Sequence, residues 1–279
     1  MSGKRPEIEP PYRDLEFMDS LPARPVRILT EYIDPLQRLR SENVGDTIVI
    51  FGSARIHSRE QALARLKGLR NKGKTEASLR HREAVRDARA ALGMSRYYEE
   101  ARELSRRITS WSMSLGEQPK RFVVCSGGGP GIMEAANRGA ADAGGKSIGL
   151  SIELPHEQRP NAYISPELNF MFHYFFMRKL WFAQMAKALI VFPGGFGTID
   201  ELGELLTLMQ TGKLQQRVLI LIYGRKFWDR VLNWKHMVRC GTITRREYAL
   251  LQFADTVDEA FSRIRDGLEA HHMKPDRLV

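Results

Sequence analysis

Short apolar runs recur through the middle of the chain, each bounded by glycine or polar residues. The runs hold four or five residues, are rich in Val and Ile, and do not alternate with polar positions. This pattern is typical of strands buried on both faces, as in a parallel sheet. It predicts strands at residues 47–51, 121–125, 147–150, 188–192 and 218–222.

Helical stretches separate most of these runs. Strands that alternate with helices in this way predict an α/β fold with a doubly wound parallel sheet. The predicted helices lie at residues 132–143, 173–187, 199–211 and 226–238.

Residues 46–270 are expected to form one domain around this sheet. The proline-rich residues 1–45 predict an N-terminal extension with a helix at 24–40, and residues 271–279 a C-terminal tail. Nearly seventy residues separate the first two predicted strands, whereas a βαβ unit needs about 30. The surplus predicts a helical insertion over residues 58–118, with helices at 75–92 and 95–114.

Most of the net positive charge of the chain lies in this insertion. The whole sequence carries 43 Lys and Arg against 33 Asp and Glu, a net charge of +10, and residues 59–107 hold +7 of it. Such a segment is either a polyanion-binding surface or a solvated helical hairpin. Acids are interleaved at helical spacings, and no aromatic residue for base stacking lies between Arg59 and Arg96. This favours the solvated hairpin, so nucleic acid is not the expected partner.

Composition narrows the class of protein further. Hydrophobic residues make up 43% of 279 residues and charged residues 27%, which is an ordinary globular balance. Two cysteines, Cys125 and Cys240, cannot build a disulfide framework. No apolar run approaches the ~18 residues of a membrane span, and the N-terminus lacks the apolar stretch of a signal peptide. We therefore expect a soluble, cytoplasmic protein.

Residues 68–75 (GLRNKGKT) match the P-loop pattern letter for letter. A P-loop needs a buried strand to deliver the loop and a helix N-terminus to hold the phosphates. The preceding residues, 59–67, read as a helix instead. The match is therefore interpreted as accidental.

A second glycine-rich segment, residues 126–140 (SGGGPGIMEAANRGA), follows a predicted strand directly. Its glycines, including Gly128 and Gly129, let the backbone approach a ligand closely. The G-x-G-x-x-G fingerprint is not met, so NAD is not implied and no cofactor is expected. The order strand, glycine turn and helix suits a mononucleotide or another phosphate. A tight turn without a ligand remains the alternative.

The third candidate is residues 193–202 (PGGFGTIDEL), after the predicted strand 188–192. Gly194, Gly195 and Gly197 would expose backbone N–H groups, with Thr198 opening the next helix. A capping box between Thr198 and Glu201 would explain these two residues without a ligand. Two glycine turns after two buried strands nevertheless favour one cleft at the carboxyl edge of the sheet.

An aromatic-rich segment, residues 170–182 (FMFHYFFMRKLWF), precedes this third loop. Such density is more typical of a core or an interface than of a cofactor site. Arg178 and Lys179 interrupt it and need anionic partners, for which a phosphate or Glu201 would serve. No metal site is readable around His173, and Cys125 has no nearby His to make it a nucleophile.

Four motifs together resemble the Lonely Guy family: FGSAR at residues 51–55, SGGGPGIMEAANRGA, the MRK triplet at 177–179, and PGGFGTIDEL. Members are cytokinin-activating nucleoside 5′-monophosphate phosphoribohydrolases, many of them labelled "lysine decarboxylase". The resemblance implies a Rossmann-like fold, a homo-oligomer, and hydrolysis of AMP or N6-modified AMP to free base and ribose 5-phosphate. It covers residues 47–211 apart from the insertion.

The resemblance also implies roles for particular residues. The family's conserved arginine falls on Arg178 and its motif glutamate on Glu201, so these two are the predicted catalytic residues. Asp200 stands where many members have Glu and keeps the carboxylate. The N-terminal extension and the basic insertion depart from the family pattern, which favours a longer subtype with a higher oligomeric state.

The chemistry of N-glycosidic bond cleavage also suits these residue types. Breaking an N-glycosidic bond develops oxocarbenium character, which the Glu201 carboxylate would stabilise unless it orients the attacking water. Amides of the PGGFGT loop and the Thr198 hydroxyl would hold the 5′-phosphate, while Arg178 orients the ribose or assists the leaving base. Glu134 would line the sugar and base side. The predicted nucleotide-binding set also contains Ser53, Gly128, Gly129, Lys179, Asp200, Gly194, Gly195 and Gly197.

Two other readings compete with the hydrolase. A non-catalytic carrier of a nucleotide or cofactor would use the same fold, but it needs no carboxylate beside an anionic ligand. The pair of Arg178 and Glu201 therefore favours the enzyme. A pyridoxal-phosphate decarboxylase is rejected, because neither Lys179 nor Lys187 has the sequence context of a Schiff-base lysine.

Overall fold

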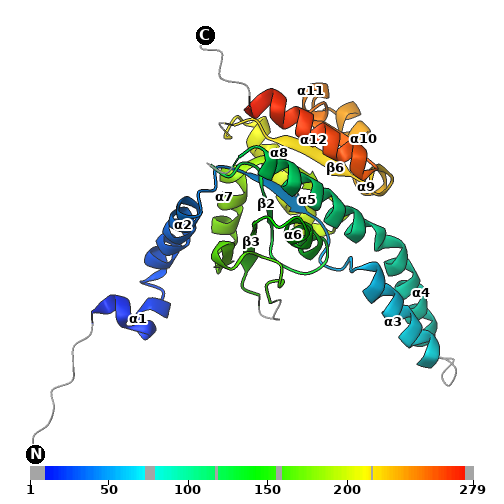
Figure 1. Ribbon diagram of the computed structural model, residues 1–279, viewed down its shortest axis with the longest axis horizontal. Coiled ribbons are helices and arrows are strands. Elements are labelled where there is room, and N and C mark those ends of the chain that lie inside the picture. The colour runs from blue at the N-terminus through cyan, green and yellow to red at the C-terminus, as the bar shows by residue number, and fades with distance from the viewer. Residues whose placement is uncertain (1–9, 73–78, 117–118, 155–158, 215, 274–279) are drawn as a thin grey trace, which may run out of the picture.

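The computed structural model describes residues 10–72, 79–116, 119–154, 159–214 and 216–273. Seven strands of this part form one sheet in the order β4-β3-β2-β1-β5-β6-β7, and neighbouring strands pair in parallel (Figure 1). The predicted doubly wound α/β fold is therefore confirmed, and it is Rossmann-like. The strands are β1 (Thr47–Phe51), β2 (Val123–Ser126), β3 (Ser147–Ile152), β4 (Asn169–Phe172), β5 (Ala186–Val191), β6 (Leu219–Tyr223) and β7 (Leu251–Ala254).

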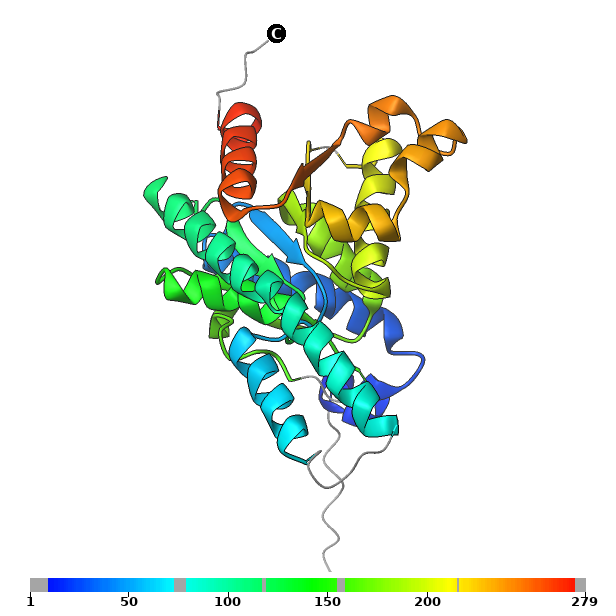
Figure 2. The same cartoon turned by 90° about the vertical axis from the view of Figure 1, so that its right-hand side faces the viewer.

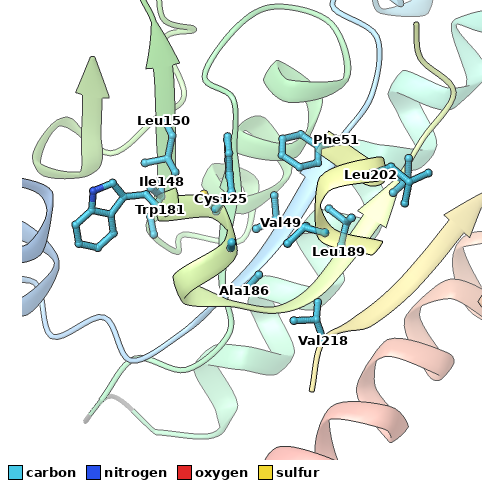
Figure 3. Packing of buried hydrophobic residues seen from close by; sticks show 14 of the residues in the cluster. Val49, Phe51, Cys125, Ile148, Leu150, Trp181, Ala186, Leu189, Leu202 and Val218 are labelled. Atoms are coloured by element: carbon cyan, nitrogen blue, oxygen red, sulfur yellow. The ribbon is translucent and has the colours of Figure 1, made fainter. Parts of the chain in front are cut away.

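The central strands are buried on both faces because their side chains point alternately to two separate cores. In β1, Val49 and Phe51 face one cluster, whereas Ile48 and Ile50 face the other. Figure 3 shows the first cluster, in which Val49 and Leu189 lie near Leu202 of a covering helix. Continuous apolar runs are thus the sequence signature of a sheet with helices on both sides.

Two layers of helices supply these cores. The first face is covered by α2 (Arg24–Ser41), α7 (Phe175–Met185), α8 (Phe196–Gln210), α9 (Arg225–Val231) and α10 (Trp234–Arg239). The second face is covered by α5 (Arg96–Ser114), α6 (Ile132–Asp142) and α12 (Val257–His272). The described chain also contains four short elements: η1 (Pro11–Arg13), α1 (Leu15–Asp19), η2 (Pro166–Leu168) and α11 (Arg245–Tyr248).

The N-terminal helix α2 agrees with the predicted helix at 24–40 and is fastened to the body by specific hydrogen bonds. Nη2 of Arg38 donates to the carbonyl oxygens of Glu167 (2.7 Å) and Asn169 (2.9 Å), just before and within β4. Glu31 accepts from the backbone N–H of His173 at 2.7 Å. The helix therefore braces the segment that leads into α7.

The basic stretch divides into two structurally different parts. Helices α3 (Arg59–Lys72) and α4 (Leu79–Met94) form a hairpin that extends from the body (Figures 1 and 2). By contrast, α5 is part of the core, and its Tyr98, Leu104 and Ile108 are fully buried. The predicted helix at 95–114 is confirmed. The P-loop match also lies on α3 as far as residue 72, with its remaining residues outside the described part.

Several predicted boundaries need correction. Strand β2 begins at Val123 rather than 121, because Asp46 accepts from the Arg121 guanidinium (2.7 Å) and from the N–H of Phe122, whose φ is +55°. The predicted helix 173–187 spans only Phe175–Met185, and Lys187 lies in β5. These differences arise because long-range hydrogen bonds and strand pairing, not local pattern, set the ends of the elements.

Other elements differ more strongly from the sequence predictions. The predicted helix 226–238 is two helices, with Leu232 and Asn233 between them. Strands β4 and β7 were not predicted: each has four residues with an interrupted burial pattern, since they lie at the two edges of the sheet. Helix α12 was not predicted either. Among the described residues, no helix is both long and apolar enough to cross a membrane.

Candidate active site

A cavity of about 740 Å³ opens at the carboxyl edge of the sheet. Its walls come from the loops after β1, β2 and β5, the end of β3, and side chains of α7 and α8. Strands β1 and β5 are neighbours, and the order of the chain reverses between them. Ligands of open α/β sheets bind at such a switch point, so the expected single cleft is present where the topology requires it.

The glycine turn after β2 is held tightly against the loop after β1. Gly131 has a φ of +70°, and a Cβ there would lie 2.4 Å from the carbonyl oxygen of Ser53. The N–H of Ile132 donates to that same oxygen at 3.1 Å. On the other side, Nδ2 of Asn161 donates to the carbonyl oxygens of Gly128 (3.0 Å) and Gly129 (3.1 Å). The turn is therefore preorganised before any ligand arrives.

The PGGFGT loop does not form the capping box that was the alternative explanation of Thr198 and Glu201. Helix α8 begins at Phe196 with Gly195 as its N-cap, and no side-chain cap bond is found there in the described structure. Thr198 is thus inside the first turn and buried. Because the first backbone N–H groups of a helix have no intrahelical partner, this end of α8 presents donors and a positive dipole to the cavity.

Arg178 of α7 and Glu201 of α8 form an ion pair in the wall of the cavity. Nη2 of Arg178 lies 3.2 Å from Oε1 of Glu201, and only 14% and 7% of the two side chains are exposed. The guanidinium also lies over the rings of Phe175 and Phe182, at 5.1 and 5.9 Å from their centroids. Its Nε is buried without a hydrogen-bond partner in the described part of the chain.

Burial shifts the protonation of this pair. It raises the pKa of the Glu201 carboxyl to about 7, although Arg178 and Lys179 act in the opposite direction. Burial likewise lowers the pKa of Arg178, against the pull of Glu201. A carboxyl group with a pKa near neutrality can hold or accept a proton at ordinary pH, which is the property that acid–base catalysis requires.

Most of the predicted site residues meet in this one cavity. Its lining includes Ser53, Gly128, Gly129, Gly194, Gly195, Gly197, Thr198, Arg178 and Glu201. Gly194 is required by close packing, because a Cβ there would lie 2.1 Å from Oγ1 of Thr198.

Three predicted residues lie outside the lining as the structure describes it. Oε1 of Glu134 accepts a hydrogen bond from the Tyr98 hydroxyl at 2.6 Å, so this carboxylate ties α6 to α5. Nζ of Lys179 pairs with Asp200 (2.8 Å) and Glu204 (3.0 Å) on α8. These contacts hold helices together and give the three side chains partners within the protein.

Some lining residues were missed by the sequence predictions. Arg55 lies in the FGSAR motif, Phe175 begins α7, and Ser151 lies near the end of β3. Ser151 lies one residue beyond the predicted strand 147–150, and β3 holds a second serine, Ser147, so no signal in the sequence distinguished Ser151. Cys125 is buried, and burial raises the pKa of its thiol. No group of three or more potential metal ligands was found within the described ranges.

Residues 133–264 match the family model described as "Possible lysine decarboxylase". Among curated proteins, the chain is similar to the pyrimidine/purine nucleotide 5′-monophosphate nucleosidase of Escherichia coli K12, with 30% identity over 149 residues. The protein of the same name from E. coli O157:H7 matches equally well. The alignment covers 47% of this chain and 31% of each relative, so the chain spans about a third of their length.

Solved structures with a similar arrangement include the Moco carrier protein from Chlamydomonas reinhardtii, with 17% identity and a TM-score of 0.44 over 81% of this chain and 98% of that one. The molybdenum cofactor binding protein from Rippkaea orientalis has 19% identity and a TM-score of 0.43, over 62% and 88% of the two chains. Likeness at this level says nothing about what the present chain binds.

The family match covers the part of the chain that carries the MRK triplet and the PGGFGTIDEL segment. Arg178 and Glu201, which these motifs contribute, are the ion pair in the cavity wall. The resemblance seen in the motifs is therefore confirmed by the match of residues 133–264 to the family model described as "Possible lysine decarboxylase".

Proposed function

We propose that this protein hydrolyses the N-glycosidic bond of nucleoside 5′-monophosphates, of AMP or N6-modified AMP in particular, to free base and ribose 5-phosphate. The observation that carries the proposal is the buried pair of Arg178 and Glu201 beside the N-terminus of α8, in one cavity at the switch point of the sheet. The matched relatives are nucleotide 5′-monophosphate nucleosidases, which agrees with this reaction class.

The 5′-phosphate would bind at the start of α8. There the first-turn N–H groups and the hydroxyl of Thr198 supply donors, and the helix dipole favours an anion. Gly195 and Gly197 are exposed, with no described atom within 4 Å of a Cβ placed on them. A phosphate can therefore approach the backbone closely. Its binding energy would fix the ribose over Glu201.

Glu201 would act on the anomeric carbon. In the reaction the C1′–N bond breaks with its electron pair going to the base, which takes up a proton, and a water oxygen bonds to C1′. The Glu201 carboxylate stabilises the positive charge that develops on the ribose and accepts a proton from the attacking water. A pKa of about 7 makes this carboxylate a stronger base than an exposed one.

Arg178 would position the substrate beside that carboxylate. Its guanidinium is held by Glu201 and by two aromatic rings, while its Nε has no partner among the described residues. A ribose hydroxyl or the leaving base can accept a hydrogen bond from this Nε–H group after a small shift of the Arg178 side chain. Apolar lining residues support a purine in the remaining space: Met133, Ile152, Leu154, Phe175, Ile199 and Val231.

The proposal is tested by assaying purified protein for free base and ribose 5-phosphate with a panel of nucleoside monophosphates. Glu201→Gln should lower kcat by at least ~100-fold, the size seen when a group that stabilises transition-state charge is removed. Glu204→Gln is the matched control, because Glu204 lies on the same helix and pairs with Lys179 outside the cavity lining. Equal activities of Glu201→Gln and the wild type would refute the role of Glu201. AMP binding without base release would instead favour the carrier alternative.

We also propose that the chain assembles with copies of itself. Apolar side chains of the N-terminal helices are exposed, among them Leu15 on α1 and Val26, Leu29 and Ile33 on one side of α2. Such a patch favours association. Light scattering should give a mass above the 31.9 kDa of one chain, and Leu29→Glu should lower it. A monomeric wild type at micromolar concentration would disprove this.

A further inference from the structure

Ser151 is a buried hydroxyl in the cavity wall, and no hydrogen bond within the described ranges satisfies it. The residue is 5% exposed, and its Oγ has no partner in the described structure. The same oxygen lies so close to Gly128 that a Cβ there would be 2.1 Å from it. Leaving a buried hydroxyl unpaired is unfavourable, so a residue that does so beside a cavity indicates a partner that arrives with the ligand.

The sheet places Ser151 far from the phosphate end of the cavity. Ser151 is in β3, whereas the PGGFGT loop follows β5, and strands β2 and β1 lie between them. Neighbouring strands are about 4.8 Å apart, so three steps across the sheet are roughly 14 Å. A nucleotide whose phosphate sits at α8 therefore extends along the strand ends, and its base is the part that reaches β3.

The surroundings of Ser151 fit a base. Ile152 and Leu154 follow it along the chain, and Met133 lines the same cavity, so apolar side chains that can contact the faces of a base lie near one polar group. A hydroxyl both donates and accepts, which suits the mixed edge of a nucleobase.

The backbone beneath this end of the cavity is also fixed. Asn137 is fully buried and donates to Oγ of Ser147 (3.0 Å) and to the carbonyl oxygen of Ile148 (3.2 Å) in β3. Its Oδ1 accepts from the hydroxyl of Ser126 (2.7 Å) and from Nδ2 of Asn161 (2.9 Å). The network joins β2, β3 and the glycine turn, so Ser151 is presented by a rigid frame.

We propose that the end of the cavity between β2 and β3 is the base subsite and that Ser151 hydrogen-bonds the edge of the base. Ser151 thereby helps to determine which nucleotides are accepted. This inference rests on the proposed function, since it takes the ligand to be a nucleoside monophosphate with its phosphate at α8.

The test compares two ligands that differ by the base alone. Calorimetric binding of AMP and of ribose 5-phosphate is measured in the Glu201→Gln background, which prevents turnover. Adding Ser151→Ala should weaken AMP binding about three- to tenfold, the effect of one hydrogen bond, and change ribose 5-phosphate binding less than about twofold. Thr109→Val is the matched control, because it removes another buried hydroxyl without a partner among the described residues, and Thr109 lies on α5 outside the cavity lining. It should change neither affinity.

Each outcome decides the matter. If Ser151→Ala weakens the binding of AMP and of ribose 5-phosphate equally, Ser151 only shapes the Gly128 turn. If AMP binding is unchanged, Ser151 does not contact the base. Either result overturns the proposal. If Ser151→Ala does not fold, Ser151→Cys carries the same comparison. If the wild-type protein releases no base from AMP, but Ser151→Ala still weakens AMP binding more than ribose 5-phosphate binding, the proposed hydrolase activity is refuted and the base subsite is supported. A wild type that binds no AMP would refute both.

Discussion

Burial of Glu201 should make the free energy of unfolding depend on pH, and comparison with the Glu201→Gln variant should isolate this dependence. The carboxyl has its pKa raised from 4.5 to about 7 in the fold, where only 7% of the side chain is exposed. In the unfolded chain it titrates near its ordinary value. Between these two values the folded state keeps a proton that the unfolded state releases, so raising the pH favours unfolding.

The size of the effect follows from the shift. Each pKa unit corresponds to 1.36 kcal/mol, so a rise from 4.5 to about 7 amounts to about 3 kcal/mol. The contribution is fully present below pH ~4.5 and is lost as the pH rises through ~7. Glu201→Gln cannot titrate. In this variant Arg178 loses its ionisable partner. Because Arg178 stays charged over the whole pH range, this loss changes the free energy of unfolding of the variant by an amount that does not depend on pH.

Urea unfolding of wild type and Glu201→Gln at pH 5, 6, 7 and 8 measures this directly. The wild type should lose about 2 to 3 kcal/mol relative to the variant between pH 5 and pH 8, since part of the contribution is already lost at pH 5, and most of this loss should be complete by pH 7.5. A difference between the two proteins that stays constant with pH would show that Glu201 titrates normally in the fold. The raised pKa would then be wrong, and with it the argument for an unusually basic carboxylate.

Three further predictions concern the same architecture. Activity should rise with pH and level off above about 7, because the ionised form of Glu201 is the reactive one; a rate independent of pH between 5.5 and 8 would contradict this. Gly131→Ala should lower the free energy of unfolding by at least ~2 kcal/mol, because the new Cβ would overlap a backbone oxygen. Gly144→Ala is the control: Gly144 has a φ of +74° but no described atom near a Cβ, so this variant should lose about 1 kcal/mol. Equal losses of the two variants in urea unfolding would contradict the packing argument. Iodoacetamide at pH 8 should label exposed Cys240 and spare Cys125, whose thiol is buried with a raised pKa; rapid labelling of both by mass spectrometry would contradict this.

The α/β class and most of the predicted residues that line the cavity were recognisable in the sequence, because both follow from local pattern. Strands buried on both faces must be continuously apolar, so β1, β5 and β6 are visible as runs. Glycine turns after such strands must converge at one edge of a parallel sheet, which brings Gly128 and Gly194 into one cavity. The edge strands β4 and β7 escaped prediction, since short strands at the edge of a sheet carry only a weak pattern.

The same limit applies to individual side chains. Lys179, like Arg178, interrupts an apolar segment, and the sequence placed both in the nucleotide site. In the fold, one turn of α8 offers Asp200 and Glu204 to Lys179, while Glu201 is left to Arg178 inside the cavity wall. The alternative of a Thr198–Glu201 capping box failed because the helix starts earlier, at Phe196.

The sequence by itself determined the chemistry available to this protein: buried parallel strands, glycine turns at their ends, and an arginine and a glutamate in neighbouring motifs. Tertiary structure alone decided which of these groups meet. Pairing between strands distant in the chain set the order β3-β2-β1-β5, and this order brings Ser151 into the cavity and gives Glu134 to Tyr98. The physical reason is that burial and partnership depend on neighbours brought together by long-range packing, which no local pattern of residues records.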